Sequence, residues 1–138
     1  MNVNYESINE GDNIPAFSVK MDRTTYFKYN ELVNEFNPLH FNDKYAKSLG
    51  FKDIVVAGVY TFSFAPRLIA DWLGEPGRIK SIEVKYIKPA YIEDEVTYKG
   101  VVKNKRLEDN RKIVECEVYS ENSEGTRLLE AKVALNMD

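Results

Sequence analysis

Residues 58–73 are the stretch that most restricts what this chain can fold into. The segment holds only two charged residues, Arg67 and Asp71, and its other positions are mainly apolar or small. A helix that is apolar on nearly all sides is one that the rest of the protein encloses. Pro66 lies inside the segment and removes one backbone hydrogen bond, so we expect a bend there. The pattern predicts a long buried helix that ends at Gly74.

The second half of the chain changes to the two-residue period of β-strands. Apolar and polar residues alternate in four segments, which are residues 81–86, 95–103, 114–119 and 129–136. Strands of this kind have one apolar and one polar face, and together they predict an antiparallel meander. The apolar face needs cover, and the long apolar helix is the only element able to supply it. The sequence therefore predicts an α+β fold in which a curved antiparallel sheet wraps around a central helix.

The first half carries shorter elements. Alternation over residues 16–21 predicts a first strand. Apolar residues at helical spacing predict a helix over residues 25–35, with Asp22 or Thr24 as its N-cap. A second short helix is expected over residues 43–49.

Length and composition limit the class of protein. The chain has 138 residues without a repeat, linker or low-complexity stretch, so we expect a single domain over residues 1–138. A formal net charge of -3 without a dense Lys/Arg run argues against a general nucleic-acid binder. We find no signal-peptide pattern and no membrane-spanning stretch, so a cytoplasmic location is the expectation. One cysteine and one histidine provide no metal-ligand cluster, and neither a metal nor a cofactor is expected.

The hexapeptide Glu-Phe-Asn-Pro-Leu-His at residues 35–40 is the candidate site. It places a carboxylate, a side-chain amide and the only histidine of the chain in one stretch. Asn37-Pro38 favours a turn, because a residue before proline is pushed out of the helical region. Gly58 then opens the apolar helix. An acid and an imidazole on a turn, facing the backbone N–H groups of a helix start, can supply proton transfer and hydrogen-bond donors.

These residues resemble the MaoC-like family of (R)-specific enoyl-CoA hydratases and dehydratases. The family's pattern is Gly-Asp-x-Asn-Pro-Leu/Ile-His, then Ala-x-x-x-Gly-Phe/Leu, then His-Gly at the start of the central helix. The matching stretches here are Asn37-Pro38-Leu39-His40, Ala46, Gly50-Phe51, Gly58 and residues 67–74. The resemblance implies the hot-dog fold and a hydro-lyase. Such an enzyme hydrates trans-2-enoyl thioesters, or dehydrates (R)-3-hydroxyacyl thioesters, carried on coenzyme A or acyl carrier protein.

The resemblance also assigns roles to individual residues. The acid and the base of the family, which share one water molecule, fall on Glu35 and His40. The N–H of Gly58 would donate to the thioester oxygen as that oxygen becomes enolate-like. Asn37 would orient the acid or hold the turn, and Ala57 and Ser63 are further candidates for substrate binding. The family further implies a homodimer with sheets joined edge to edge, or a higher and possibly heteromeric assembly.

Two substitutions separate the chain from the family's pattern. Gly-Asp appears as Asn34-Glu35, and His-Gly appears as Ala57-Gly58. Glutamate keeps the carboxylate but adds about 1.5 Å of reach, and asparagine tolerates left-handed backbone better than most residues. The glutamate leaves open a non-catalytic subunit that binds acyl thioesters or supports a catalytic partner. An acyl-CoA thioesterase on the same fold is the other alternative.

Several of the singled-out residues also have a structural interpretation. His40 could satisfy local hydrogen bonds within a turn, and Asn37 could form an Asx-type turn. Candidates for contact with a coenzyme A phosphate, or for a solvated strand face, are Tyr86, Lys85 and Lys88. Both interpretations remain open from the sequence.

Overall fold

The structure is a computed structural model that describes residues 3–138, so the domain expected over residues 1–138 is seen from residue 3 onward. The strands are β1 Asn13–Lys20, β2 Ile79–Tyr86, β3 Glu95–Glu108, β4 Arg111–Glu121 and β5 Arg127–Asn136. The helices are α1 Arg23–Leu32, α2 Asp43–Ser48, α3 Gly58–Phe62 and α4 Phe64–Leu73, with short 3-10 turns η1 Tyr5–Ser7 and η2 Pro38–His40. Within the described residues, no helix is long and apolar enough to cross a membrane.

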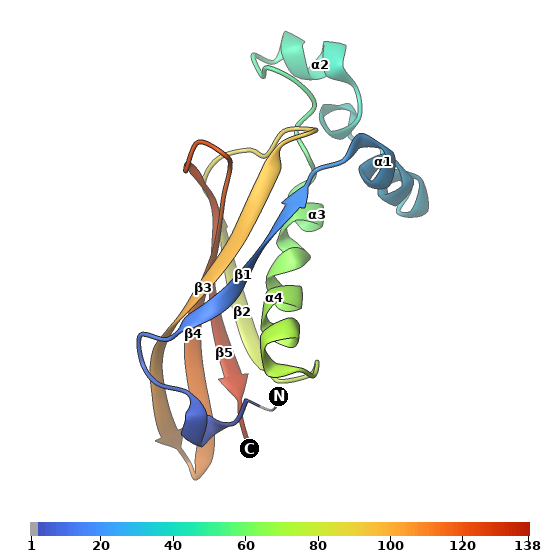
Figure 1. Ribbon diagram of the computed structural model, residues 1–138. Helices are drawn as coiled ribbons and strands as arrows, with labels where there is room; N and C mark the ends of the chain where they lie inside the picture. Colours follow the sequence, from blue (N-terminus) through green and yellow to red (C-terminus); the bar gives the residue numbers. More distant parts are fainter. Residues whose placement is uncertain (1–2) are drawn as a thin grey trace.

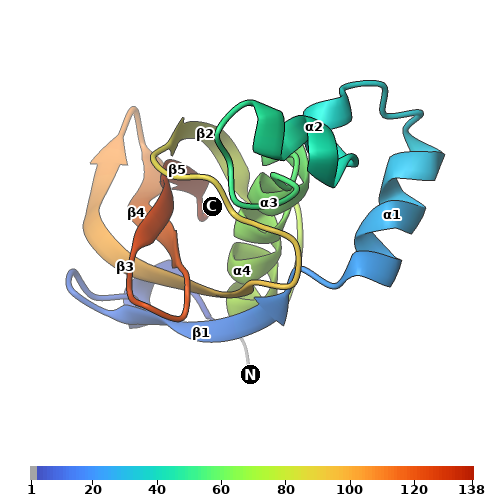
Figure 2. The ribbon, with the colours of Figure 1, turned by 90° about the horizontal axis from the view of Figure 1, so that it is seen from above.

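The five strands form one antiparallel sheet in the order β1-β3-β4-β5-β2. The edges of the sheet are therefore β1 and β2. The sheet curves around α4, which lies along its inner face (Figures 1 and 2). The predicted α+β arrangement, a curved antiparallel sheet around a central helix, is confirmed.

The core lies between the inner face of the sheet and α4. The inner row of β3, β4 and β5 is buried and consists mainly of Val96, Tyr98, Val102, Val114, Cys116, Val118, Leu129, Ala131, Val133 and Leu135. The helix contributes Ala65, Leu68, Ile69 and Leu73. Each of the larger aliphatic side chains stabilises the fold by about 1.5–3 kcal/mol when it leaves water. The alternation seen in the sequence thus corresponds to the buried and exposed faces of the sheet.

The central helix is interrupted near Pro66. It consists of α3 and α4, and Ser63 between them keeps helical angles of φ -58° and ψ -21°. Proline lacks an N–H, and its ring crowds the carbonyl four residues earlier, which belongs to Phe62. The disturbance expected from Pro66 thus takes the form of a one-residue break between α3 and α4. The disruption lies one turn before the proline.

The central helix is exposed along one stripe, which consists of residues 59, 63, 67 and 71. Val59 on α3 is 67% exposed, and Val84 and Tyr86 on the edge strand β2 are also exposed. The sheet packs against one side of the helix (Figure 1). The rest of the helix surface is buried or half-buried, so the expected enclosure on most sides is confirmed. The apolar side chains of Val59, Val84 and Tyr86 remain open to a partner.

The elements α1, η2 and α2 lie above the start of the central helix (Figures 1 and 2). Asp22 caps α1, and its carboxylate accepts a hydrogen bond of 2.9 Å from the N–H of Thr25. The helix ends at Leu32, three residues before its predicted end. Asn34 then adopts a left-handed φ of 54°, which asparagine tolerates. Glu35 consequently lies on the turn after the helix.

Candidate active site

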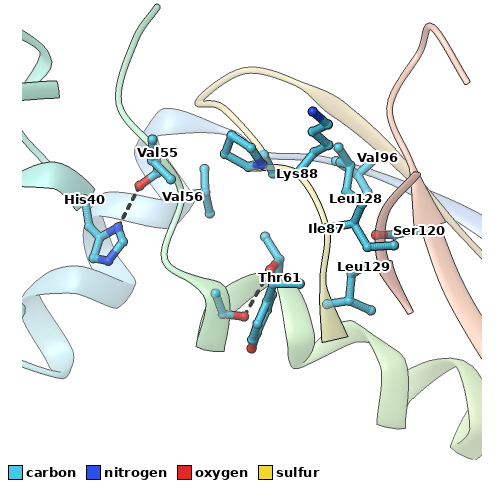
Figure 3. Close-up of a pocket in the computed structure, with 14 residues that line it drawn as sticks. His40, Val55, Val56, Thr61, Ile87, Lys88, Val96, Ser120, Leu128 and Leu129 are labelled. Carbon is cyan, nitrogen blue, oxygen red and sulfur yellow. Dashed lines mark hydrogen bonds between the residues drawn. The ribbon is translucent and has the colours of Figure 1, made fainter. Parts of the chain in front are cut away.

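His40 is held on η2 with its imidazole in a defined orientation. The side chain of Asn37 caps this turn by accepting a hydrogen bond from the N–H of Leu39, 3.1 Å long, and Pro38 occupies its first position. The Nδ1 atom of His40 lies 2.8 Å from the carbonyl oxygen of Val55 (Figure 3). A carbonyl oxygen only accepts hydrogen bonds, so Nδ1 carries the proton. In the neutral ring Nε2 is therefore left with its lone pair, as a general base requires.

Tyr26 joins this turn to the central helix. Its hydroxyl donates to the carbonyl of His40 at 2.8 Å and accepts from the buried N–H of Ala57 at 2.9 Å. Asn30 donates to the same carbonyl from Nδ2 at 3.3 Å. Burial is the main cause that raises the pKa of Tyr26, and the negative charge of Glu35 adds to it. The hydroxyl is therefore neutral at physiological pH and can donate and accept at once.

A cavity of about 250 Å³ lies beside His40 and the start of α3. Figure 3 shows its lining, which comes from η2, the 55–61 segment, the chain after β2, and the inner face of the sheet. The side chains are mostly apolar, with the hydroxyls of Thr61, Tyr86 and Ser120 and the ammonium of Lys88 among them. Burial raises the pKa of Tyr86, so this hydroxyl also stays neutral. A mostly apolar cavity with a few polar groups is the usual form of a small-molecule site.

Gly58 lines the same cavity. It is the first residue of α3, and its N–H has no hydrogen-bond acceptor among residues 3–138. A Cβ atom at this position would lie 3.0 Å from the Cε1 and Cζ atoms of Tyr86. Glycine therefore permits the ring of Tyr86 to lie close to the backbone. A free donor and a free imidazole nitrogen thus border one cavity.

Glu35 borders a different hollow. That hollow is wider and more open, and it is lined by Phe27, Asn30, Glu31, Asn34, Glu35 and Phe41. The carboxylate of Glu35 accepts a hydrogen bond of 2.9 Å from the N–H of Asn37, two residues along the chain. The expectation that Glu35 and His40 face one cavity is therefore not met in this structure. This hydrogen bond within the turn holds the carboxylate of Glu35 at the second hollow.

The other predicted site residues do not line the cavity. Asn37 is exposed and makes the Asx-type turn bond described above. Ala57 is buried and contributes its N–H to the hydroxyl of Tyr26. Ser63 is exposed, and its hydroxyl donates to the carbonyl of Tyr60 at 2.6 Å. Within the described residues, no group of three or more His, Cys, Asp or Glu side chains is placed to hold a metal ion.

The sequence reading missed three residues at or beside the cavity. Tyr26 belongs to the apolar stripe of α1, and nothing in that stripe distinguishes its hydroxyl from the hydroxyl of Tyr29. Thr61 and Ser120 are small polar residues within apolar patterns, which is the sequence signal that marks them. Tyr86 and Lys88, named as candidates for contact with a coenzyme phosphate, do line the cavity.

The fold and the cavity define a class of small α+β protein in which a sheet wraps around a helix and a site lies at the start of that helix. A family model described as "MaoC like domain" matches residues 11–124. The chain therefore belongs to the MaoC-like domain family. The resemblance predicted from the Asn-Pro-Leu-His motif is confirmed.

Several relatives are hydratases or dehydratases by name. The chain is 41% identical over 69 residues to the mitochondrial 3-hydroxyacyl-(acyl-carrier-protein) dehydratase FERN of Solanum lycopersicum. That match covers 49% of this chain, and the chain spans only 41% of the tomato protein. The cytoplasmic location expected from the sequence stays a prediction, because this relative is described as mitochondrial.

Solved structures confirm the hot-dog fold. The ChsH1-ChsH2 complex from Mycobacterium tuberculosis contains a chain with 27% identity and a TM-score of 0.80, over 94% of this chain and 98% of that one. The (R)-hydratase from A. caviae has 19% identity and a TM-score of 0.83, over 96% of this chain and 99% of that one. The curved sheet and central helix are thus those of the hot-dog hydratases.

Proposed function

We propose that this chain is a hydro-lyase that adds water to trans-2-enoyl thioesters, or removes it from (R)-3-hydroxyacyl thioesters, carried on coenzyme A or acyl carrier protein. The observation that carries the proposal is the bond between Nδ1 of His40 and the carbonyl of Val55. It leaves Nε2 of the neutral ring free beside a cavity that also receives the unpaired N–H of Gly58. Membership of the MaoC-like family supports the same chemistry.

The two groups supply complementary parts of the reaction. Nε2 of His40 takes a proton from water while the water oxygen bonds to C3 of the enoyl group. The electron pair of the C2–C3 π bond moves toward the thioester, whose oxygen gains negative charge. The N–H of Gly58 donates to that oxygen. A proton then returns to C2, so that the elements of water are added and no electrons are exchanged.

Glu35 is the second proton-transfer group in this proposal. Its carboxylate must leave the N–H of Asn37 and turn toward the cavity, which costs about 1 kcal/mol for the lost hydrogen bond. Two observations support this role. The side chain is only partly buried, and its charge already contributes to raising the pKa of Tyr26, whose hydroxyl bonds to the carbonyl of His40.

Variants at His40 and Glu35 test the proposal with a short enoyl-CoA, whose conjugated absorbance disappears on hydration. His40→Ala should lower the rate by roughly 10²–10⁴-fold, because it removes the base, while the unfolding midpoint changes little. Glu35→Asp should retain or raise activity, and Glu35→Gln should lower it. Ser63→Ala is the matched control, because its hydroxyl only bonds within the helix. Full activity in His40→Ala would refute the mechanism.

One observation favours a second candidate, a hot-dog subunit that binds an acyl thioester or supports a catalytic partner. Glu35 borders a hollow other than that of His40, and the M. tuberculosis structure is a complex of two named components. Inactivity of the purified chain, with activity restored by a co-expressed paralogue, would support this candidate. Release of free thiol from a saturated acyl-CoA would instead support the thioesterase.

We also propose a homodimer in which the β2 edges of two chains pair. An unpaired edge strand with exposed apolar side chains favours association. Val84, Tyr86 and Ile87 are exposed at this edge, and Val59 is exposed on α3. Because Tyr86 and Ile87 also line the cavity, a partner on this edge would border the site. A paralogue on the same edge would give the heteromeric alternative.

A further inference from the structure

The wall of the cavity opposite His40 carries a hydroxyl that is not hydrogen-bonded to any described residue. Ser120 lies on the inner face of β4, in a row that otherwise contains Val114, Cys116 and Val118. Its side chain is 1% exposed and makes no hydrogen bond to any residue from 3 to 138. By contrast, the hydroxyl of Thr61 in the same cavity donates to the carbonyl of Gly58 at 3.0 Å. Because this hydroxyl keeps some accessible area where it lines the cavity, a molecule in the cavity is the partner open to it.

The surroundings of Ser120 are the closed end of the cavity. Val96, Leu128 and Leu129 line this end and are almost fully buried. Tyr86 is exposed and pairs with Leu129 from the edge strand β2, so the cavity opens at this edge of the sheet. Figure 3 shows Ser120 and Leu129 on the far side of the cavity from His40. A molecule that enters past Tyr86 therefore meets hydrocarbon on its sides and the hydroxyl of Ser120 at the inner end.

The proposed reaction determines which part of a substrate reaches this end, and the inference rests on that reaction. The reacting carbons lie near His40 and the thioester oxygen near Gly58. The carrier is too large for a cavity of about 250 Å³ and must extend outward past Tyr86 and Lys88. The distal part of the acyl group is left for the closed end. The whole cavity holds roughly eight groups of the size of a water molecule, so the acyl group is short.

We propose that Ser120 selects short acyl groups that carry a hydroxyl or carbonyl oxygen at their distal end. Such an oxygen can exchange a hydrogen bond with the hydroxyl of Ser120. A hydrocarbon end of the same size would displace water and leave the hydroxyl buried without a partner, which is unfavourable. The expected preference for the oxygenated acyl group is roughly 10- to 100-fold.

An isosteric pair of substrates tests this preference. In 6-hydroxy-trans-2-hexenoyl-CoA a terminal hydroxyl replaces the terminal methyl of trans-2-heptenoyl-CoA. The wild-type chain should hydrate the hydroxylated compound with the higher kcat/KM. The saturated analogues, 6-hydroxyhexanoyl-CoA and heptanoyl-CoA, should show the same order in equilibrium binding, which does not require turnover.

Two variants at the same position separate the hydroxyl from the shape of the cavity. Ser120→Ala should abolish the preference in both assays, whereas Ser120→Thr, which keeps a hydroxyl, should retain it. Equal use of the two compounds by wild type, or an unchanged preference in Ser120→Ala, would overturn the inference. If wild type binds the analogues with the expected order but hydrates neither enoyl compound, the proposed reaction fails and the inference stands. Hydration without preference refutes the inference alone, and absence of binding refutes both.

Discussion

Removing one hydroxyl, by Tyr26→Phe, tests whether the turn that carries His40 is held against the central helix as the structure indicates. The hydroxyl makes two hydrogen bonds, one to the carbonyl of His40 and one from the N–H of Ala57. Phenylalanine has the same ring and fills the same space. The substitution therefore removes the two bonds without leaving a large void.

The expected loss of stability follows from the hydrogen bond that each partner of the Tyr26 hydroxyl loses. The N–H of Ala57, a residue that is 5% exposed, is left buried without an acceptor, which costs about 1–3 kcal/mol. The carbonyl of His40 keeps its longer hydrogen bond from Asn30, so losing the bond from Tyr26 adds little to the destabilisation. A total of about 2 kcal/mol corresponds to a fall in Tm of roughly 6–8 °C for a chain of this length. The base also becomes less well placed, and kcat should fall by roughly 10- to 100-fold with a smaller change in KM.

Urea unfolding and hydration of a short enoyl-CoA measure the two effects. Tyr29→Phe is the matched control, because Tyr29 lies on the same helix with its ring 6.4 Å from that of Tyr26. Its hydroxyl makes no hydrogen bond to any described residue, so this variant should resemble wild type in both assays. A loss of less than about 0.5 kcal/mol in Tyr26→Phe, or equal losses in the two variants, would contradict the reasoning.

Three further perturbations address the cavity, the core and the sheet edge. Gly58→Ala places a methyl group against the ring of Tyr86, which is exposed and can shift, so kcat/KM should fall by more than about tenfold while the urea midpoint changes little. Burial raises the pKa of Cys116 from 9.0 to about 12, so its contribution to stability is complete below pH 9 and is lost as pH rises toward 12. Urea unfolding from pH 8 to 11 should therefore show a slope of up to about 1.4 kcal/mol per pH unit that Cys116→Ala lacks. Val84→Lys should convert the proposed dimer to monomer in light scattering, because it places a charge on the β2 edge; an unchanged mass would contradict that edge as the interface.

The period-two alternation located the strands of the second half correctly but not all of their ends. It predicted a strand that stops at Lys103, whereas β3 continues to Glu108. A register shift between Val102 and Asn104 breaks the alternation at that point. A similar shift between Ile14 and Phe17 explains why β1 begins before the predicted residue 16. An extra residue in one strand moves the following side chains to the other face, so a strictly alternating template ends there.

The candidate site was predictable only where it depends on local chemistry. Asn37 and Pro38 specify the turn, Gly58 starts the helix, and Asn34 adopts the left-handed angle that asparagine tolerates. The partners that complete the site come from far along the chain. Ser120 reaches the cavity only because β4 lies beside β5 in the sheet, where Ser120 pairs with Leu129, and no local pattern contains that information.

The structure separates a fixed part of the site from an adjustable one. His40 and Ala57 share the hydroxyl of Tyr26 through backbone atoms, so the base and the neighbouring N–H of Gly58 are set by the fold. The carboxylate of Glu35 depends on side-chain torsions and on one exposed turn bond. Loss of the carboxylate should therefore lower kcat and leave thioester binding nearly intact. Loss of the Tyr26 hydroxyl should lower both the free energy of unfolding and kcat. That contrast distinguishes an enzyme with a mobile acid from a subunit whose carboxylate has no part in the chemistry, because only in the enzyme does Glu35→Gln change the rate.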